Sequence, residues 1–342
     1  MIFLSTGIVS ALLVLRLFSG LSQSVGLNIL LFLSSGILLL QAANLLVKNI
    51  MQVAQYLRWR EFVVAFFVMA IGGSLPNLFV GIFSAIHDIP ELSFGDIVGN
   101  GLADLTLVAA LAVFLGKELK GESRVVQTSV FFMSVAAILP LLLLLDGTLG
   151  REDAIILILM FLFYSVWLLS KRRIFTHLYT LEGKETPLKE FKGFTQGLFF
   201  LLVGTLAMGI SAQAVIETTI FFAQTFHIPL ILIGILMVGL GSALPETYFT
   251  IVSAAKNQQW IILGVLIGSV TVLSTLILGI VALLNPIEIE DFSPFAIARF
   301  FLIISALLFL VFLRTGKKIT KKEAFILLGL YITFVVAELL FK

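Results

Sequence analysis

The sequence predicts an all-α polytopic membrane protein with two inverted five-helix repeats, which form a ten-helix core, and an extra N-terminal helix. Three observations predict this fold. Hydrophobic residues make up 60% of the 342 residues and charged residues only 12%, whereas a soluble domain has roughly 25% charged residues. Apolar runs of about 20 residues, long enough to cross a hydrocarbon core, follow one another along the chain. A Gly/Ser/Pro motif also occurs twice, and its prolines, Pro76 and Pro245, differ by 169 in residue number.

The apolar runs predict eleven helices. The first, at 2–20, contains Arg16 but lacks the basic start and the cleavage site of a signal peptide, so we expect the mature chain to retain it. The other predicted helices are 27–50, 60–86, 93–115, 124–146, 152–170, 195–224, 229–255, 260–284, 295–314 and 322–341. Since each repeat contains an odd number of helices, the second copy must cross the membrane in the opposite sense.

These helices divide the chain into four parts. We expect an extra transmembrane helix in 1–26, a first repeat in 27–170, a connecting loop in 171–194 and a second, inverted repeat in 195–342. The sequence therefore predicts one integral membrane protein in contact with lipid.

Lys and Arg residues fall in alternate loops, as the positive-inside rule requires. The basic loops contain Lys48, Arg58 and Arg60; Lys117, Lys120 and Arg124; Lys171, Arg172, Arg173, Lys184, Lys189 and Lys192; Lys256; and Arg314, Lys317, Lys318, Lys321 and Lys322. This pattern places the connecting loop in the cytoplasm, and we expect the plasma (inner) membrane of a prokaryote. The net charge of +2 is too small to indicate a nucleic-acid partner, and the absence of Cys excludes thiolate chemistry.

The two copies of the motif predict breaks in the helices 60–86 and 229–255. Pro76 and Pro245 cannot donate a backbone hydrogen bond, so each helix should kink or break there and free backbone carbonyls. Such groups must pack against protein or line a wet cavity. One break could be a packing kink, but two matched breaks, followed by Asn77 and Glu246, indicate a substrate site between the halves.

Several polar side chains inside the apolar runs are candidate ligands. Glu246 is the strongest, because an ionised carboxylate is expensive inside a membrane. Asn100 and Asp104 are four residues apart and can share a helix face. Asp96 lies two turns before Asp104 and could equally be a helix-start residue. Oxygen ligands of this kind suit Ca²⁺, Mg²⁺ or Na⁺ better than a soft metal.

With these residues, the chain resembles the cation/Ca²⁺ exchanger superfamily, whose repeats carry the pattern G-T/S-S-x-P-E followed by G-N-x-x-G-S-N. The first repeat here reads Gly72-Gly73-Ser74-Leu75-Pro76-Asn77 and Gly95-Asp96-Ile97-Val98-Gly99-Asn100-Gly101. The second reads Gly241-Ser242-Ala243-Leu244-Pro245-Glu246 and Gly264-Val265-Leu266-Ile267-Gly268-Ser269.

The resemblance implies an asymmetric site, in which the two repeats contribute different ligand residues. The central glutamates of the family fall on Asn77 and Glu246, and the motif hydroxyls on Ser74 and Ser242. The downstream serine position falls on Asn100 and Ser269, and the polar position four residues later on Asp104 and Leu273. The implied metal ligands are Glu246, Asp104, Asn77, Asn100, Ser74, Ser242 and Ser269, with Asp96 as a further acidic candidate.

The implied function is secondary antiport by alternating access, in which Ca²⁺ or a related cation exchanges for Na⁺ or H⁺. The helices 27–50 and 195–224 would slide against the site bundle, and the transported cations would be the only small-molecule partners. The residues leave the choice of Na⁺ or H⁺, the stoichiometry and the oligomeric state open. A transport-impaired relative that binds ions or a protein partner is the alternative. An enzyme is disfavoured, because the sequence offers no metal triad and no nucleophile with a base.

Overall fold

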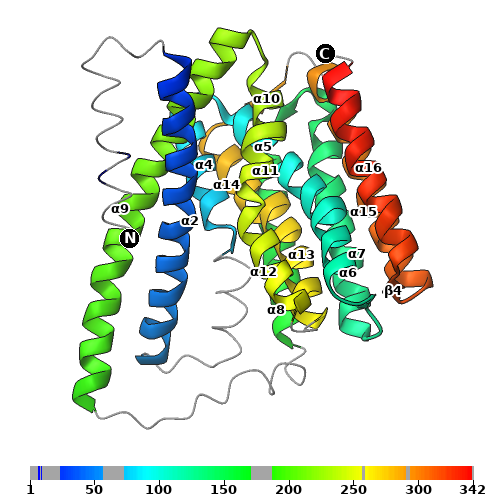
Figure 1. Ribbon diagram of the computed structural model, residues 1–342, viewed down its shortest axis with the longest axis horizontal. Coiled ribbons are helices and arrows are strands. Elements are labelled where there is room, and N and C mark those ends of the chain that lie inside the picture. The colour runs from blue at the N-terminus through cyan, green and yellow to red at the C-terminus, as the bar shows by residue number, and fades with distance from the viewer. Residues whose placement is uncertain are drawn as a thin grey trace.

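The computed structural model describes residues 24–56, 73–170, 187–255, 259–289 and 293–340, together with Gly7 and Val9. In these ranges the chain is almost entirely helical (Figure 1). Apart from Gly7 and Val9, the predicted helix at 2–20 lies outside the described part of the chain, and so do residues 60–72 of the predicted helix 60–86.

The first half contains long helices and shorter broken ones. Its helices are α2 (Val25–Tyr56), α4 (Leu75–Ile86), α5 (Pro90–Ala103), the π-helical η3 (Asp104–Val108), α6 (Ala109–Leu115), α7 (Arg124–Leu143), the 3₁₀ turn η4 (Leu144–Asp146) and α8 (Arg151–Ser170). Two short strands, β1 (Leu119–Lys120) and β2 (Thr148–Leu149), precede α7 and α8.

The second half follows the same plan. Its elements are α9 (Pro187–Phe226), α10 (Leu230–Ile233), the π-helical η6 (Gly234–Val238), α11 (Gly239–Ser242), α12 (Leu244–Ala255), α13 (Gln259–Val272), the π-helical η7 (Leu273–Ile277), α14 (Leu278–Leu284), β3 (Ile287–Glu288), α15 (Ser293–Thr315), β4 (Lys318–Ile319) and α16 (Lys321–Leu340). Helix α9 begins eight residues before the predicted start at 195, because Pro187 suits the first turn of a helix.

The element boundaries repeat at the spacing that the two motifs have in the sequence. Helix α4 shifted by 169 residues coincides with α12, and α5 with α13. The π-helical segments η3 and η7 match in the same way. The two halves therefore have the same local structure at equivalent positions, including the irregular π-helical turns.

Two small antiparallel sheets tie the halves together at their ends. Strand β1 of the first half pairs with β4 of the second, and β2 of the first half pairs with β3 of the second. Because the 20-residue helix α7 separates β1 from β2, the two sheets lie at opposite ends of the helix bundle.

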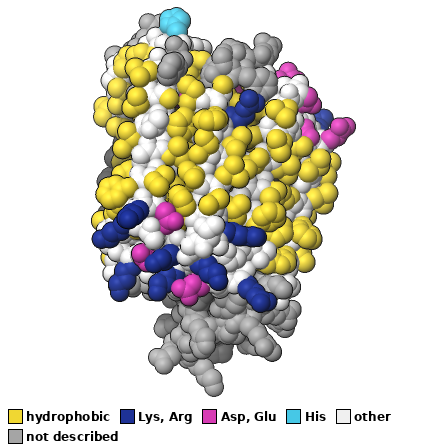
Figure 2. Space-filling model, turned by 90° about the vertical axis from the view of Figure 1, so that its right-hand side faces the viewer, with side chains coloured by type: hydrophobic (Ala, Val, Ile, Leu, Met, Phe, Trp, Pro, Cys, Tyr) yellow, Lys and Arg dark blue, Asp and Glu magenta, His cyan; other side chains and the backbone are white. Residues whose placement is uncertain are grey.

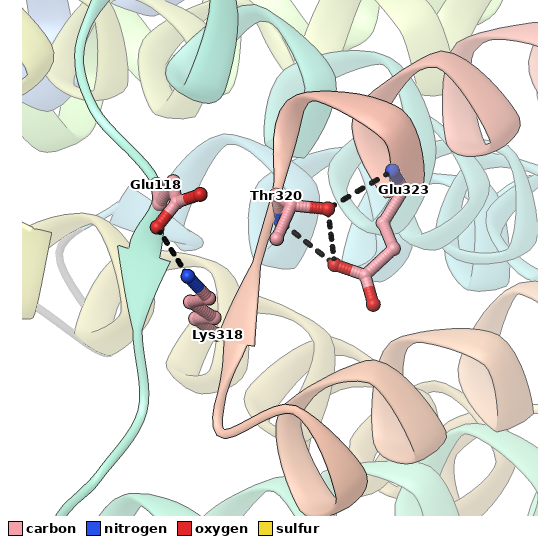
Figure 3. A network of polar contacts seen from close by, with 4 residues as sticks. All are labelled: Glu118, Lys318, Thr320 and Glu323. Atoms are coloured by element: carbon pink, nitrogen blue, oxygen red, sulfur yellow. Dashed lines mark hydrogen bonds and ion pairs between the residues drawn. The ribbon is translucent and has the colours of Figure 1, made fainter.

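The end that contains β1 and β4 also holds an ion pair and a helix cap. Lys318 Nζ donates to Glu118 Oε2 at 2.8 Å across the two halves (Figure 3). At the start of α16, the backbone nitrogen of Thr320 donates to Glu323 Oε2 at 2.7 Å, and the nitrogen of Glu323 donates to Thr320 Oγ1 at 3.4 Å. This reciprocal arrangement is a capping box, which satisfies backbone donors that a helix start leaves free.

Helices α2 and α9 form a separate pair beside the remaining helices (Figure 1). Gly204 of α9 makes room for a side chain of α2: a Cβ on Gly204 would lie 2.8 Å from Leu46 Cδ2 and 3.6 Å from the backbone oxygen of Ala42. The Ser211 hydroxyl donates to the backbone oxygen of Ser35. Small residues and buried hydroxyl bonds are the usual means by which membrane helices associate.

Within the described residues, six helices are long and apolar enough to cross a membrane, or seven if the bent pair Leu230–Ser242 and Glu246–Ala255 is one span. Figure 2 shows apolar side chains over the middle of one face and Lys and Arg side chains gathered toward one end. Exposed Leu, Ile, Val and Phe side chains are numerous on the outer helices. In water such a surface would be an aggregation hazard, whereas it suits contact with lipid.

Candidate functional site

The second copy of the Gly/Ser/Pro motif interrupts a helix, as the sequence predicts, and the first copy marks the start of a helix. Helix α4 starts at Leu75 after Ser74, and Pro76 lies in its first turn. In the second copy α11 ends at Ser242 and α12 begins at Leu244. The two parts of this second span meet at 41°. Since Pro245 has no N–H group, it cannot bond to the carbonyl of Gly241, which accepts instead from a backbone N–H at the end of α11.

Glycines bring the first half of the site into backbone contact with the second. A Cβ on Gly95 or Gly99 of α5 would overlap the carbonyl oxygen of Ile231 or Ile235. From the other side, a Cβ on Gly239 would lie 2.8 Å from the backbone oxygen of Asp96 and the nitrogen of Asn100. Helix α5 therefore packs directly on α10, η6 and α11, which places Asp96 and Asn100 next to the second motif.

Asp96 is the centre of a buried network that joins the two halves. Asn77 Nδ2 donates to Asp96 Oδ2 at 3.1 Å, and Ser242 Oγ donates to Asp96 Oδ1 at 2.6 Å. Asp96 and Asn77 are fully buried and Ser242 is buried. Both carboxylate oxygens are therefore engaged by donors, one from each copy of the motif.

Asn100 connects to the same network in either orientation of its amide. In one orientation Nδ2 donates to Ser242 Oγ at 3.0 Å. In the other, Nδ2 donates to Asp104 Oδ2 at 3.2 Å, while the amide oxygen faces the Ala243 nitrogen at 3.3 Å and Ser242 Oγ at 3.0 Å. Ser242 has one proton, and its short bond to a carboxylate is the stronger use of it. The orientation of Asn100 thus depends on where the Ser242 proton points.

Glu246 and Asp104 supply two further buried carboxylates, one from each half. Glu246 Oε1 accepts from Ser269 Oγ at 3.4 Å, and the side chain is only 2% exposed. Asp104 is the first residue of η3, and π-helical turns of this kind are frequent at functional sites.

Three acceptor oxygens in this region have no hydrogen-bond partner among the described residues. They are Asn77 Oδ1, Asp104 Oδ1 and Glu246 Oε2. A buried acceptor without a donor costs free energy, about 1–3 kcal/mol for each atom and more for a charged group. Such atoms call for a specific explanation, and a cation with oxygen ligands is one that fits all three.

The remaining predicted residue, Ser74, is buried immediately before α4. Its neighbour Gly73, for which the sequence predicts no role, lies beside Glu246: a Cβ there would be 3.7 Å from Glu246 Oε1. Among the described residues, no three His, Asp or Glu side chains converge as a metal cluster. A cation held here would therefore need amide and hydroxyl oxygens in addition to carboxylates.

Comparison with known proteins shows that the sequence matches the profile of one protein family. The profile of the family described as sodium/calcium exchanger protein matches residues 27–170 and 196–340. The sodium/calcium exchanger MaX1 of Methanosarcina acetivorans is 25% identical, over 91% of this chain and 98% of its own length. The inner membrane protein YrbG of Escherichia coli is 24% identical, over 69% of this chain and 73% of its own length.

A solved structure has the same fold. The sodium–calcium exchanger NCX_Mj superposes with a TM-score of 0.62 at 22% identity and covers 91% of this chain and 98% of its own.

Proposed function

Because the chain belongs to the sodium/calcium exchanger protein family, we propose that it is a secondary antiporter that exchanges Ca²⁺ or a related cation for Na⁺ or H⁺. The family and the relative named as a sodium/calcium exchanger support cation exchange, and they do not favour the alternative of a transport-impaired binding protein. No covalent chemistry is involved. The protein would bind a cation from one side of the membrane and release it on the other.

The observation that carries this proposal is the set of three unpartnered acceptor oxygens on Asn77, Asp104 and Glu246. They belong to residues of both halves and include two carboxylates. A divalent cation in a desolvated site needs about two negative ligands with several neutral oxygens. Ser242, Ser269, Asn100 and Ser74 are the neutral candidates in our proposal, and each of them is buried.

The architecture supports alternating access between inverted halves. A two-fold operation that exchanges the halves turns the β1–β4 pair into the β3–β2 pair. Because these sheets lie at opposite ends of the bundle, the axis of that operation must lie in the membrane plane. Inverted repeats of this kind place a substrate site near the midplane, where broken helices meet. Helices α2 and α9 form a separate pair and are the candidates for sliding.

The identity of the counter-ion depends on the two carboxylates. Compared with the exchanger pattern, the site has Asn77 for glutamate and Leu273 for a polar residue, so it offers fewer oxygens for several simultaneous Na⁺ ions. Glu246 and Asp104 could instead bind H⁺ in exchange for the cation. We propose a cytoplasmic location for the connecting loop and for the β1–β4 end, where basic residues gather.

Flux measurements in proteoliposomes test the proposal. Purified protein is reconstituted, and uptake of ⁴⁵Ca²⁺ is followed under an outward Na⁺ gradient, under a pH gradient, and with neither. We expect uptake that depends on one of the two gradients and collapses when an ionophore dissipates it. Equal uptake in protein-free vesicles, with no gradient-dependent flux of any tested cation, would exclude the antiporter.

A further inference from the structure

Asp96 differs from the other buried acids of the site, because both of its oxygens already accept hydrogen bonds. One donor is the Asn77 amide at 3.1 Å and the other is the Ser242 hydroxyl at 2.6 Å. Asp104 and Glu246 each keep one oxygen without a partner among the described residues. Each Asp96 oxygen therefore uses one of its two lone-pair sites on a neighbouring side chain, which is the arrangement of a group that orients its neighbours.

We infer that Asp96 is a positioning residue, which fixes the Asn77 amide and the Ser242 hydroxyl so that their oxygens can bind the transported cation. This inference rests on the proposed function. An amide has a donor end and an acceptor end, and only the acceptor end can bind a cation. The bond from Asn77 Nδ2 to Asp96 commits the donor end, and the Oδ1 atom on the other branch of the amide is the unpartnered one.

Ser242 is fixed by the same carboxylate. Asp96 Oδ1 at 2.6 Å is nearer to Ser242 Oγ than the backbone oxygen of Gly239 at 3.1 Å, and it is charged, so it is the stronger acceptor for the single proton of Ser242. With the proton directed to Asp96, the lone pairs of Ser242 face away from Asp96. An Asn at position 96 could accept only one of these two bonds and would direct an N–H toward the other donor. Either Asn77 would turn its amide, or Ser242 would accept from position 96 and lose a lone pair that a cation needs.

The sequence contains a second, independent sign of this pairing. In the exchanger pattern G-T/S-S-x-P-E with G-N-x-x-G-S-N, the position of Asn77 is Glu and the position of Asp96 is Asn. This chain has the amide and the carboxylate exchanged between two positions that contact each other at 3.1 Å. A hydrogen bond between positions 77 and 96 is possible in both arrangements, with donor and acceptor reversed. The carboxylate at 96 is therefore needed only when position 77 is an amide.

A double-mutant cycle tests the inference in full-length protein in detergent. For Asp96→Asn, Asn77→Glu and the double variant, thermal unfolding is followed during titration with CaCl₂ and, separately, NaCl. In the wild-type background, we expect Asp96→Asn to raise the cation concentration for half-maximal stabilisation at least tenfold. In the Asn77→Glu background the same change should cause no loss. In flux assays, the loss that Asp96→Asn causes in the wild-type background should appear as a raised KM more than as a lowered maximal rate.

Ser93→Ala is the matched control, since Ser93 is buried one turn earlier in α5 and its hydroxyl has no partner among the described residues. This variant should bind cations as the wild type does. If Asn77→Glu does not fold, Asn77→Asp provides the second background.

The outcomes separate the inference from the proposed function. An equal loss from Asp96→Asn in both backgrounds would show a general structural role and overturn the inference, as would no loss in the wild-type background. A wild-type protein that no cation stabilises and that carries no flux would overturn the proposed function and the inference with it.

Discussion

Gly95 of α5 and Ile231 of α10 lie backbone to backbone. A Cβ on Gly95 would overlap the carbonyl oxygen of Ile231 and would lie 3.1 Å from the nitrogen of Ile235. This contact sets the distance between α5 and the helices that precede the second motif. The bonds of Asp96 and Asn100 to Ser242 depend on that distance, because they join side chains of only two to four heavy atoms beyond Cα.

The first prediction follows from this contact. Gly95→Ala should lower stability by about 1–3 kcal/mol, because the new methyl group forces the backbones apart. The equivalent residue of the other half, Gly264, is exposed, and a Cβ there meets no described atom within 4 Å. Gly264→Ala should therefore change stability little, or raise it through helix propensity. Thermal unfolding of the two variants provides the comparison, and an equal loss in both would contradict the proposed close packing.

The second prediction concerns Glu246. Glu246→Gln keeps the size of the side chain but removes one of two proposed negative ligands, so gradient-driven Ca²⁺ flux should fall to background. Glu338→Gln is the control, because Glu338 is also a buried acid, 3% exposed, whose two oxygens have no partner among the described residues. That variant should keep transport and gain stability, since a buried unpaired carboxylate is costly in a membrane. Normal flux in Glu246→Gln would remove this residue from the site.

The third prediction separates charge from ligand number at Asp104. Asp104→Asn preserves an oxygen at the same place but reduces the negative charge of the site by one. The attraction of a divalent ion to the site depends more strongly on that charge than the attraction of a monovalent ion does. Ca²⁺ affinity should therefore fall at least tenfold and Na⁺ affinity less. The concentrations of CaCl₂ and NaCl for half-maximal thermal stabilisation measure both. A parallel loss for the two ions would contradict the charge argument.

Much of the fold could be predicted because it follows from local sequence. Apolar runs locate the helices, and the spacing of 169 residues between the two prolines reveals the repeat. The start of α4 after Ser74 and the interruption at Ala243 also follow from local chemistry, since proline removes a helix donor.

The contacts inside the site could be predicted only in part. The candidate residues were identifiable as polar groups in apolar runs, but the bond from Ser242 to Asp96 joins residues 146 positions apart. It requires glycine contacts between α5 and α11 that sequence spacing does not reveal. The position of Gly73 beside Glu246 and the π-helical turn at Asp104 likewise depend on tertiary packing.

The fourth prediction concerns the start of α16. Thr320→Ala should destabilise the protein by about 1 kcal/mol, because it removes the hydroxyl of the capping box with Glu323.

Lys318→Gln should have a smaller effect that salt reduces further, since the ion pair of Lys318 with Glu118 is exposed. The hydrogen bond with Glu118 raises the pKa of Lys318 above 10.5. Any stabilisation by the charged Lys318 is therefore present below that pH and is lost only as the pH rises through the raised value, so thermal unfolding at pH 7 and pH 9 should show the same small difference.

The fifth prediction tests the orientation in the membrane. The chain has no Cys, so single substitutions can report the side on which a loop lies. Glu122 precedes α7 and Glu152 lies in the first turn of α8, and both side chains are exposed. In intact cells a membrane-impermeant maleimide should label Glu152→Cys, whereas Glu122→Cys should react only after the membrane is opened. The reverse result would place the basic β1–β4 end outside. Labelling of both residues in intact cells would mean that α7 does not cross the membrane. The two sheets would then lie on the same side, because α7 is the helix that separates them. A two-fold axis in the membrane plane could not exchange them, and the inverted architecture would be wrong.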